Sequence, residues 1–396
     1  MKKRVLVFCD FYLPSLGGGG GMWAVANIVD RLCDRYDFLI VAGNRNARGS
    51  TEEVAGVERG VWNRIGNADV FYVEEAKRNV AMLQKLFAEA RPDVVFLNSV
   101  FSISTIRYLQ ARARNAIAKV PTIIAPCGEL LPGALAIKAW KKRLYLAYAR
   151  LKGLYEGLIW RASFESEVEA IRSVFGREPE IMIAADLTPR AILPAFGASE
   201  KPCKTAGTAR ITFLSRISRK KNLLFLLERL LELQDVSIDL EIIGPIEDAG
   251  YWAECAQLID KMPPRIAVTV TGAVNNTAAL ERLVAAHFFA LPTLSENFGY
   301  VCIEALAAGC PLLISDRTDW GWATDAGAGW EIPLENPAAW TRAISRCAKM
   351  DNVEYLQMSA KAREIAVRWL ANPEIEKATA GLFEFALSRP EMGHQS

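Results

Sequence analysis

Two glutamates interrupt an apolar stretch of the chain, LSENFGYVCIEALAAGCPLL, which begins at Leu294. The two acids, Glu296 and Glu304, are separated by seven residues. Glutamate is rarely deeply buried alone, because an unpaired carboxylate loses much free energy when it leaves water. The pattern therefore indicates that both acids either reach water or receive a polar ligand.

The elements around these acids place them at one edge of a predicted sheet. HFFALPT before them and PLLIS after them are typical of buried strands. A helix is predicted from about Tyr300 to Ala308, between a turn at Gly299 and a stop signal at Gly309. Glu296 then follows the carboxyl end of a strand, and Glu304 lies in the first turns of the helix. Ligands of parallel α/β sheets bind at this edge, and a helix N-terminus favours anions, so we expect a ligand with phosphates for the helix and hydroxyls for the acids.

A second candidate site follows the predicted strand RITFLS. The sequence FLSRISRKKN carries four cations, Arg216, Arg219, Lys220 and Lys221. Cations at the carboxyl end of a strand, beside the start of a helix, suit a diphosphate. The alternative is a solvated basic turn, because a run of charges is usually exposed. The diphosphate interpretation is favoured because Glu296 is predicted at the same sheet edge.

A glycine run near the amino terminus, in PSLGGGGGMWAVANIVDRL, precedes a helix predicted from about Met22 to Asp34. Its backbone amides can approach a phosphate or a sugar closely. A dinucleotide fingerprint is a weaker interpretation: Gly19, Gly21 and Ala24 match G-x-G-x-x-A, but seven residues separate the glycines from the first strand. A loop that is only flexible is the third alternative.

The segment 137–161 is predicted to form one long amphipathic helix that is rich in aromatic residues. Four lysines fall on one predicted face and five apolar residues on the other: Lys138, Lys141, Lys142 and Lys152 against Leu144, Ala147, Leu151, Leu154 and Leu158. From Lys138 to Arg161, seven basic residues oppose a single acid, Glu156. Such a helix docks on anionic lipid, packs on its own domain with a solvated basic face, or meets a phosphorylated acceptor, and the sequence leaves these alternatives open.

The composition limits the class of protein. At 396 residues, 51% hydrophobic and 23% charged, the chain is too long for one ordinary core and too apolar to be disordered. A net charge of +2 does not favour nucleic acid as a partner. Eight scattered cysteines without a C-x-x-C pair, two histidines and no Asp-x-Asp pair argue against zinc or another bound metal. We expect a reducing cytoplasm, with MKKRVLVFC as a first strand rather than a signal peptide.

Strand-like and helix-like segments alternate in both halves of the chain, and a stretch richer in Pro, Gly, Lys and Thr lies between the halves. The predicted fold class is α/β, with two doubly wound domains that face each other across a cleft. The predicted boundaries are 1–190 for the first domain, 191–209 for the linker, 210–370 for the second domain and 371–396 for a C-terminal helix and tail.

Together these motifs resemble the retaining glycosyltransferases of family 4, which have the GT-B fold of two Rossmann-like domains. The resemblance covers nearly the whole chain and is strongest in the second half, where FLSRISRKKNL, IIGPIEDAGYW, VTGAV and LPTLSENFGYVCIEALAAGCPLL follow in order. In the first half, FLNSVFS and APCGELLPGALAIKAWKKRLY look like a bacterial branch that builds surface polysaccharides.

The resemblance assigns donor roles to matching residues. Glu296 would bind hydroxyls of the donor sugar, and Arg216 and Lys221 would hold the diphosphate; these three form the expected catalytic set. Phe298 and Gly299 would provide amides near the sugar, and Glu304 would bind the ribose. Gly18 and Gly19 would face the phosphates. The nucleobase pocket would be lined by Gly244, Gly272 and Val274.

The resemblance also points to an acceptor side in the first half. Five residues are expected to face the acceptor or a membrane: Asn98, Glu129, Lys138, Lys141 and Lys142. Many family members carry a histidine where this chain has Asn98 and Ser99, and relatives often have arginine where Cys127 stands.

The resemblance implies a hexosyltransferase that moves a sugar from a nucleoside diphosphate to a glycan or lipid-linked acceptor in lipopolysaccharide or exopolysaccharide biosynthesis. It implies retention of the anomeric configuration, no metal or other cofactor, and a cytoplasmic protein that can lie peripherally on the inner face of the cell membrane. Three alternatives stay open: a nucleotide-sugar epimerase or phosphorylase of the same fold, an NADP-binding oxidoreductase with Arg45 and Arg48 on the 2′-phosphate, and a non-catalytic sugar-nucleotide sensor.

Overall fold

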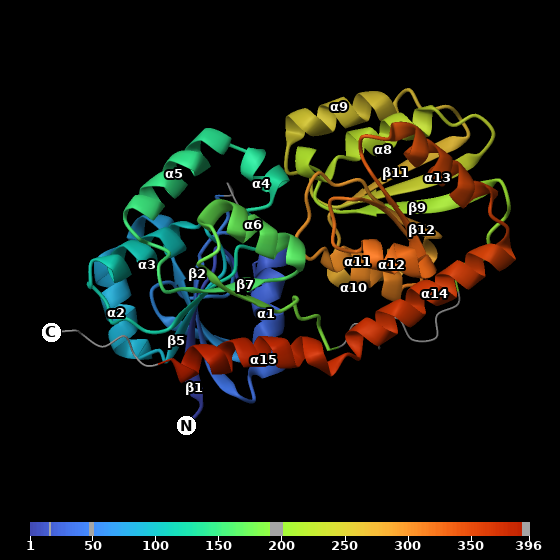
Figure 1. Ribbon diagram of the computed structural model, residues 1–396. Coiled ribbons are helices and arrows are strands. Elements are labelled where there is room, and N and C mark those ends of the chain that lie inside the picture. The colour runs from blue at the N-terminus through green and yellow to red at the C-terminus, as the bar shows by residue number, and fades with distance from the viewer. Residues whose placement is uncertain (16, 47–50, 191–200, 390–396) are drawn as a thin grey trace. The chain divides into compact units, whose positions relative to one another are not determined.

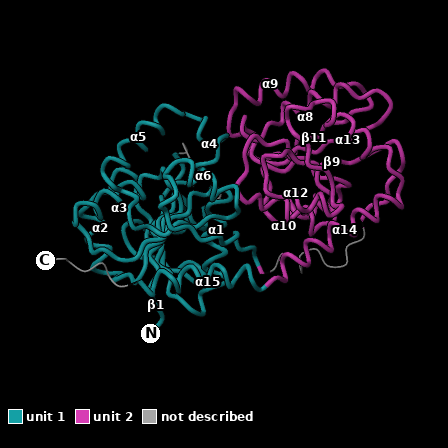
Figure 2. The backbone as a smooth tube through the Cα atoms, viewed as in Figure 1, with its two compact units in different colours: residues 1–189, 373–396 teal, residues 190–372 magenta. Residues whose placement is uncertain are grey.

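The computed structural model describes residues 1–15, 17–46, 51–190 and 201–389, and it divides into two compact units (Figures 1 and 2). The first unit combines Met1–Pro189 with Pro373–Ser396, and the second is Arg190–Asn372. The chain therefore leaves the first unit once and returns to it through its last helix. The predicted linker falls partly on residues 191–200, which lie outside the described residues. Beyond them, Lys201 Nζ donates to the carbonyls of Val284 and Ala286 at 3.0 and 2.6 Å, so the chain already belongs to the second unit there.

The first unit is built on an eight-stranded sheet of order β3-β4-β2-β1-β5-β6-β7-β8. All neighbouring strands are parallel except the β3–β4 pair. The central strands are nearly continuous apolar runs because helices cover both faces of a parallel sheet. The strands are β1 (Lys3–Phe8), β2 (Tyr36–Gly43), β3 (Trp62–Ile65), β4 (Ala68–Val73), β5 (Val94–Leu97), β6 (Thr122–Ile124), β7 (Ile159–Ala162) and β8 (Glu180–Ile183).

Two apolar clusters lie on the two faces of this sheet. One contains side chains of α2, α3, α5 and α6, and the other contains those of α1 and α15. In the second cluster, the ring of Phe383 in α15 packs against Tyr36 and Phe96 with centroids 5.3 and 5.9 Å apart, so the C-terminal helix is part of the first core. The helices are α1 (Gly19–Leu32), η1 (Glu75–Lys77), α2 (Val80–Ala90), α3 (Ile103–Ala113), α4 (Pro132–Ala136), α5 (Ala139–Leu151), α6 (Glu165–Phe175) and α15 (Pro373–Ser388).

The prediction of one helix over 137–161 is wrong. Lys138 has a positive φ of 55° and separates α4 from α5. After α5, Gly153 and Gly157 adopt φ values of 60° and 68° and turn the chain into β7, the strand Ile159–Ala162. Residues 159–162 are fully buried in the sheet, which explains why an apolar run that fits a helix face forms a strand instead.

The second unit is built on a six-stranded parallel sheet of order β11-β10-β9-β12-β13-β14. Its strands are β9 (Thr208–Leu214), β10 (Ser237–Ile243), β11 (Ile266–Gly272), β12 (Phe288–Leu291), β13 (Leu312–Ser315) and β14 (Gly329–Ile332). Its helices are η2 (Arg219–Lys221), α8 (Leu223–Leu231), α9 (Ala249–Ile259), α10 (Asn276–Ala285), α11 (Tyr300–Ala307), α12 (Gly321–Ala323), η3 (Thr324–Ala328), α13 (Pro337–Lys349) and α14 (Asn352–Leu370). The strands predicted at RITFLS, HFFALPT and PLLIS are confirmed as β9, β12 and β13.

Each sheet contains a topological switch point. In the second unit, β9 has β10 on one side and β12 on the other; in the first, β1 lies between β2 and β5. The loops that follow the two strands of such a pair leave the sheet in opposite directions, which opens a crevice for ligands at the carboxyl edge. The prediction of two doubly wound α/β units is confirmed.

Candidate active site

Four loops of the second unit meet at the carboxyl edge of its sheet. The loop after β9 is tied to the loop after β10 by Ile217 N–H, which donates to the Pro245 carbonyl at 2.9 Å. The loop after β10 is tied to the end of β11 by Gly244 N–H, which donates to the Gly272 carbonyl at 2.8 Å. Across the switch point, Leu294 N–H donates to the Lys220 carbonyl at 2.8 Å. The edge is therefore a continuous hydrogen-bonded rim.

The ammonium of Lys221 and the carboxylate of Glu296 form an ion pair at this switch point. Lys221 follows β9 and Glu296 follows β12, and the two side chains are only 10% and 13% exposed. Burial acts to raise the pKa of Glu296, but the charges of Lys221 and Lys220 outweigh it, so the pKa lies below its ordinary value. The two residues predicted from separate motifs are thus brought into direct contact, with the acid held as a carboxylate.

Glu304 lies in the second turn of α11 and differs from Glu296 in having no compensating charge. Among the described residues, no side chain forms an ion pair or hydrogen bond with its carboxylate. Burial alone raises its pKa to about 7. The thiol of Cys302 lies between the two acids: burial first, and then the charges of Glu296 and Glu304, raise its pKa well above the ordinary value. Glu304 is therefore a partly buried acceptor that lacks a donor.

Trp320 stabilises the turn between the two glutamates. Gly299 has a φ of 72° and caps α11, as its predicted turn requires. The Trp320 Nε1–H donates to the Phe298 carbonyl at 2.5 Å, and the rings of Phe298 and Trp320 pack with centroids 5.5 Å apart. A Cβ at Gly299 would come within 3.1 Å of Glu296 Cγ and 3.4 Å of Trp320 Nε1. Trp320 was not predicted as a site residue; its signal in the sequence is the Trp- and Gly-rich segment TDWGWATDAGAGW, residues 318–330.

The remaining donor residues predicted in this unit lie along the same rim. Arg216 is exposed and pairs with Glu247 at 2.8 Å. Gly244 has a φ of 140°, and a Cβ there would lie 2.0 Å from the Ser215 carbonyl oxygen, so only glycine fits. Gly272 is the last residue of β11, and Val274 follows it at the outer end of the rim.

In the first unit, the glycine run does not form a separate loop before the helix, because α1 begins at Gly19. Gly18 is its N-cap, and Gly21 lies in its first turn. The Asn98 side chain follows β5 and donates to the Gly21 carbonyl at 2.8 Å, while the Cys127 thiol donates to Asn98 Oδ1 at 3.1 Å. Asn98 therefore connects the glycine run to the loop after β6.

Glu129 is also engaged within the chain. Its carboxylate accepts from the Ser99 hydroxyl at 2.8 Å and from the amides of Val100 and Phe101 at 2.7 and 3.2 Å. Burial raises the pKa of this acid, and these hydrogen bonds counteract the rise. In this arrangement Glu129 orders the loop between β5 and α3 at the carboxyl edge.

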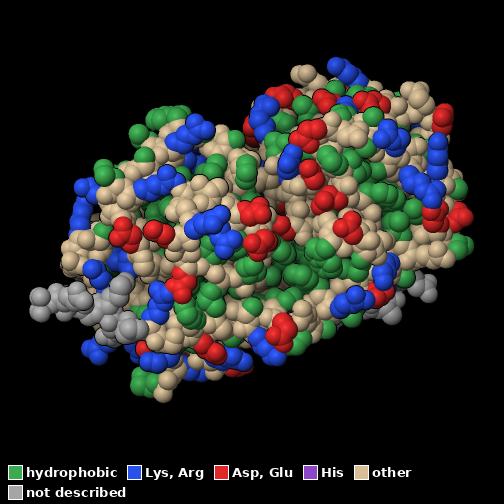
Figure 3. All heavy atoms as spheres, viewed as in Figure 1, with side chains coloured by type: hydrophobic (Ala, Val, Ile, Leu, Met, Phe, Trp, Pro, Cys, Tyr) green, Lys and Arg blue, Asp and Glu red, His purple; other side chains and the backbone are tan. Residues whose placement is uncertain are grey.

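The three lysines predicted to face an acceptor or a membrane lie at the start of α5. Lys138 and Lys141 are exposed, and Lys142 Nζ donates to the Ala134 carbonyl at 2.7 Å and lies 5.0 Å from the Phe101 ring centroid. Five large apolar side chains of this region are exposed: Ile137 50%, Trp140 67%, Leu144 68%, Tyr148 38% and Leu151 82%. The predicted apolar face was wrong in part, because Leu154 and Leu158 are buried beyond the helix. Figure 3 shows green and blue side chains side by side over α5 at the upper left.

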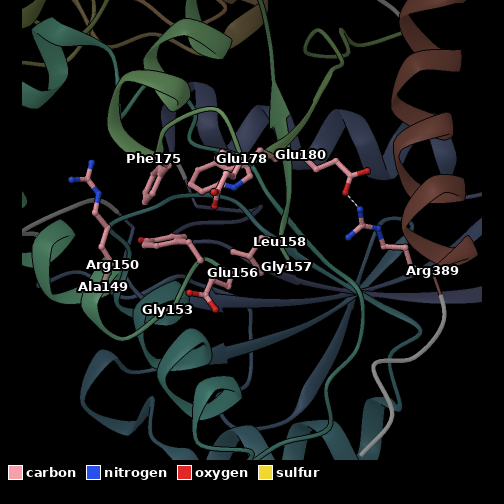
Figure 4. A pocket seen from close by; sticks show the side chains of 13 residues that line it. Ala149, Arg150, Gly153, Glu156, Gly157, Leu158, Phe175, Glu178, Glu180 and Arg389 are labelled. Atoms are coloured by element: carbon pink, nitrogen blue, oxygen red, sulfur yellow. Dashed lines mark ion pairs between the residues drawn. The ribbon is translucent and has the colours of Figure 1, made fainter. Parts of the chain in front are cut away.

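A cavity at the opposite edge of the first sheet does not belong to this site. It is lined by the loops that precede β7 and β8, with Glu156, Glu178 and Phe175 on its walls and the ion pair of Glu180 with Arg389 at one end (Figure 4). Its position at the amino ends of the strands sets it apart from the carboxyl edges where α/β sheets bind their ligands. Of the two arginines considered for a 2′-phosphate, Arg45 pairs with Glu53 at 3.9 Å, and Arg48 lies outside the described residues.

Residues 208–350 match the protein family described as "Glycosyl transferases group 1". A segment of 121 residues is 33% identical to the D-inositol 3-phosphate glycosyltransferase of Nocardia farcinica. This segment is 28% of the chain and spans about a quarter, 27%, of that relative.

Several solved structures share the fold of the whole chain. The sucrose-phosphate synthase of Thermosynechococcus elongatus superposes with a TM-score of 0.76 at 16% identity, covering 98% of this chain and 100% of that one. An Anabaena protein in complex with UDP and glucose gives 0.66 at 14% identity over 97% and 100%. WaaG, a glycosyltransferase involved in lipopolysaccharide biosynthesis, gives 0.64 at 14% identity over 96% and 99%. The chain has the GT-B fold, and the match to the group 1 family lies within its second unit.

Proposed function

We propose that the protein is a glycosyltransferase that moves a hexose from a nucleoside diphosphate sugar to a hydroxyl of a glycan or lipid-linked acceptor. One observation carries the proposal: a buried lysine–glutamate pair and an uncompensated carboxylate stand together at the switch point of the second sheet. A nucleotide sugar suits these groups, because its diphosphate binds cations and its hydroxyls donate hydrogen bonds to carboxylates. The match of residues 208–350 to a glycosyltransferase family supports the same assignment.

In the proposed donor complex, Lys221 contacts the diphosphate while Glu296 accepts hydrogen bonds from hydroxyls of the sugar. The ion pair already holds both side chains in place, so little reorganisation accompanies binding. As the bond to the sugar breaks, negative charge grows on the leaving diphosphate. A fixed cation at that point contributes about 3–4 kcal/mol to transition-state stabilisation in a site from which water is excluded.

Arg216 is proposed as the second cation on the diphosphate. Its ion pair with Glu247 is exposed on both sides, at 45% and 41%. Pairs of this kind contribute about 1 kcal/mol or less, so the guanidinium can turn from Glu247 to a phosphate at small cost. Glu304 then binds the ribose hydroxyls, and Gly244, Gly272 and Val274 leave room for the base.

We further propose that transfer retains the anomeric configuration and needs no metal ion, because Lys221, Arg216 and the N-terminus of α11 supply the positive charge. The acceptor hydroxyl attacks from the face that the diphosphate leaves and gives its proton to a departing phosphate oxygen. The fold shared with WaaG supports a role in lipopolysaccharide or exopolysaccharide biosynthesis.

The exposed stripe of α5 supports docking on an anionic membrane surface. Trp140, Leu144, Tyr148 and Leu151 recur at helical spacing and remain in contact with water, so the helix does not bury this face in its own unit. Exposed lysines and arginines flank it, which favours lipids with negative headgroups. None of the described helices combines the length and apolar composition that a bilayer-spanning helix requires.

The test is a product assay with nucleoside diphosphate sugars, with and without candidate acceptors. We expect a new glycoside whose anomeric proton coupling in NMR matches that of the donor, at the same rate after dialysis against EDTA. Turnover of the sugar without any acceptor would instead favour an epimerase. Inversion, or activity that EDTA removes and magnesium restores, would contradict the proposed mechanism.

A further inference from the structure

A second cavity of the first unit, of about 570 Å³, lies between η1, the start of α2 and one face of α3. Six of the residues that line it are polar: Glu75, Arg78, Asn79, Arg107, Gln110 and Arg114. We call it the arginine pocket. Its volume falls within the range of about 300–1,000 Å³ that is typical of small-ligand sites.

The charges of the arginine pocket do not balance. Arg107 and Arg114 are exposed on the same face of α3, seven residues apart, and among the described residues neither forms an ion pair. With Arg78 they place three guanidiniums at the pocket, whose lining contains one carboxylate, that of Glu75, while Asp10 outside the lining pairs with Arg78. Like charges held together repel one another, and the carboxylates of Glu75 and Asp10 offset only part of this repulsion.

Arg78 connects the pocket to the carboxyl edge of the first sheet. It is only 7% exposed, donates to the Ser104 hydroxyl at 2.9 Å and lies 3.9 Å from the Asp10 carboxylate. Burial lowers the pKa of its guanidinium, which Asp10 partly offsets. Its Nε has no hydrogen-bond partner among the described residues. Asp10 follows β1 and Ser104 lies in the first turn of α3, the helix after β5, so Arg78 lies at the switch point of this sheet.

The N-terminus of α2 adds positive potential to the same pocket. Asn79 is its N-cap, and its side chain accepts from the Met82 amide at 3.0 Å. The first turn of α2 contains no acidic residue. A helix N-terminus carries a partial positive charge, so the neighbouring arginines destabilise it and a bound anion would stabilise it.

We propose that the arginine pocket binds a phosphate group of the acceptor, which makes the acceptor a phosphorylated sugar or a lipid-linked sugar phosphate. This inference rests on the proposed glycosyltransferase function. Arg107 and Arg114 form no ion pair among the described residues, and a phosphate, with several acceptor oxygens, can satisfy both guanidiniums where a single carboxylate cannot. The planar donor fork of arginine suits phosphate oxygens, and Arg78 aligns the phosphate with the edge where the reactive hydroxyl has to lie.

The experiment is a calorimetric titration of the full-length protein with inorganic phosphate, in the presence of a saturating nucleoside diphosphate that occupies the donor site. The test variant is R107A/R114A, whose exposed side chains can be removed without disturbing the core. The control is R64A/R177A, which removes two exposed arginines of the same unit outside the pocket. We expect the test variant to bind phosphate at least tenfold more weakly and the control within twofold of the wild type.

Equal phosphate affinity in the two double variants, or no phosphate binding by a protein that binds the nucleotide, would overturn the inference and leave the proposed function standing. A protein that binds no nucleoside diphosphate would instead contradict the proposed function itself. Hexose 6-phosphate and a short-chain polyprenyl phosphate in detergent distinguish the two sources. The probe that binds more tightly than inorganic phosphate to the wild type, but not to R107A/R114A, shows whether the acceptor is a sugar phosphate or a lipid-linked phosphate.

Discussion

Glu296 and Glu304 are both withdrawn from water, but their surroundings drive their ionisation in opposite directions. The neighbouring lysine holds Glu296 as a carboxylate, whereas burial without a partner raises the pKa of Glu304 to about 7. Glu296 is therefore ionised beside Lys221 before any ligand binds. The second is stabilised as an anion only when a ligand supplies hydrogen-bond donors.

Donor binding should therefore depend on pH through Glu304. Ribose hydroxyls favour the ionised acid, so binding lowers its pKa and releases a proton. Affinity for the nucleoside diphosphate should rise roughly tenfold from pH 6 to pH 8 and level off above the pKa near 7. Titration calorimetry at several pH values measures this rise.

The control for this prediction is Glu304→Gln, which should flatten the profile apart from the titration of the ligand itself. The folded state holds a proton on Glu304 more tightly than the unfolded state, so this acid costs stability as pH rises from its ordinary value toward 7. The variant should thus unfold at a higher temperature than the wild type at pH 8. An unchanged pH profile would show that Glu304 does not bind the donor.

Lys221→Ala should reduce transfer at least 100-fold, because it removes the cation proposed to stabilise the leaving diphosphate. It should also lower the free energy of unfolding by roughly 3 kcal/mol, since it leaves the Glu296 carboxylate nearly buried without a partner. Steady-state kinetics and urea unfolding measure the two effects.

The double variant Lys221→Ala/Glu296→Gln separates these effects. Removing the uncompensated charge should recover most of the stability and none of the activity. If activity returned together with stability, the pair would have a structural role only.

The sequence motifs predicted Lys221, Glu296 and Glu304 because their types and positions after strands or at a helix start are visible in the chain. The residues that hold the neighbouring backbone in place were harder to predict from the sequence. Trp320, which holds the Phe298 carbonyl, and Thr293, whose hydroxyl donates to the Lys220 carbonyl at 3.1 Å, contribute through tertiary contacts that leave no local pattern. Asn98 and Glu129 were predicted to face an acceptor, but their hydrogen bonds within the chain could not be read from the sequence.

At the scale of elements, the site depends on loops that approach one another closely at the ends of β9, β10 and β11. Gly244 permits this approach, because any side chain there would overlap the Ser215 carbonyl. The strands were predictable because parallel strands buried on both faces form apolar runs. In the first unit, β3, β4, β7 and β8 were not predicted; β3 and β8 are only partly buried, and β7 follows directly from a helical pattern.

Gly244→Ala should destabilise the second unit by about 3 kcal/mol and weaken nucleotide binding, because the rim must open to admit the new carbon. Gly207→Ala is the matched control. Gly207 also has a positive φ, of 91°, but nothing lies within 4 Å of its added Cβ and it has no proposed role at the site, so only backbone strain of about 1 kcal/mol is expected. Thermal unfolding and nucleotide titration of both variants check this, and equal effects would contradict the close-approach argument.

The exposed stripe of α5 should hold the protein on anionic vesicles. Replacing Trp140 and Leu144 by serine should reduce the bound fraction at least fivefold in sedimentation with phosphatidylglycerol vesicles, because two large apolar side chains no longer enter the interface.

The matched control replaces Val353 and Leu356, which are exposed at 65% and 41% on α14. It should leave vesicle binding unchanged. Equal binding by the α5 variant and the wild type would mean that α5 is simply an exposed helix.

At the scale of the whole molecule, the chain builds two Rossmann-like units and completes the first with its last helix. Arg31 pairs with Glu376 at 2.7 Å. Phe383 of α15 packs in the core beside a sheet whose strands all precede residue 190. A separate C-terminal helix from residue 371 was predicted from the sequence, but its return to the first unit was not, because the partner of an amphipathic helix is set by tertiary packing. The two units present two carboxyl edges, one with a lysine–glutamate pair and one with arginines.

The most direct test of the account is a crystal structure with a bound nucleoside diphosphate sugar. We expect the diphosphate to contact Lys221 and Arg216, the sugar hydroxyls to bind at Glu296 and the ribose to bind at Glu304. A nucleotide sugar bound away from the β9–β12 switch point, or bound there with Lys221 and Glu304 turned away from it, would contradict the central claim.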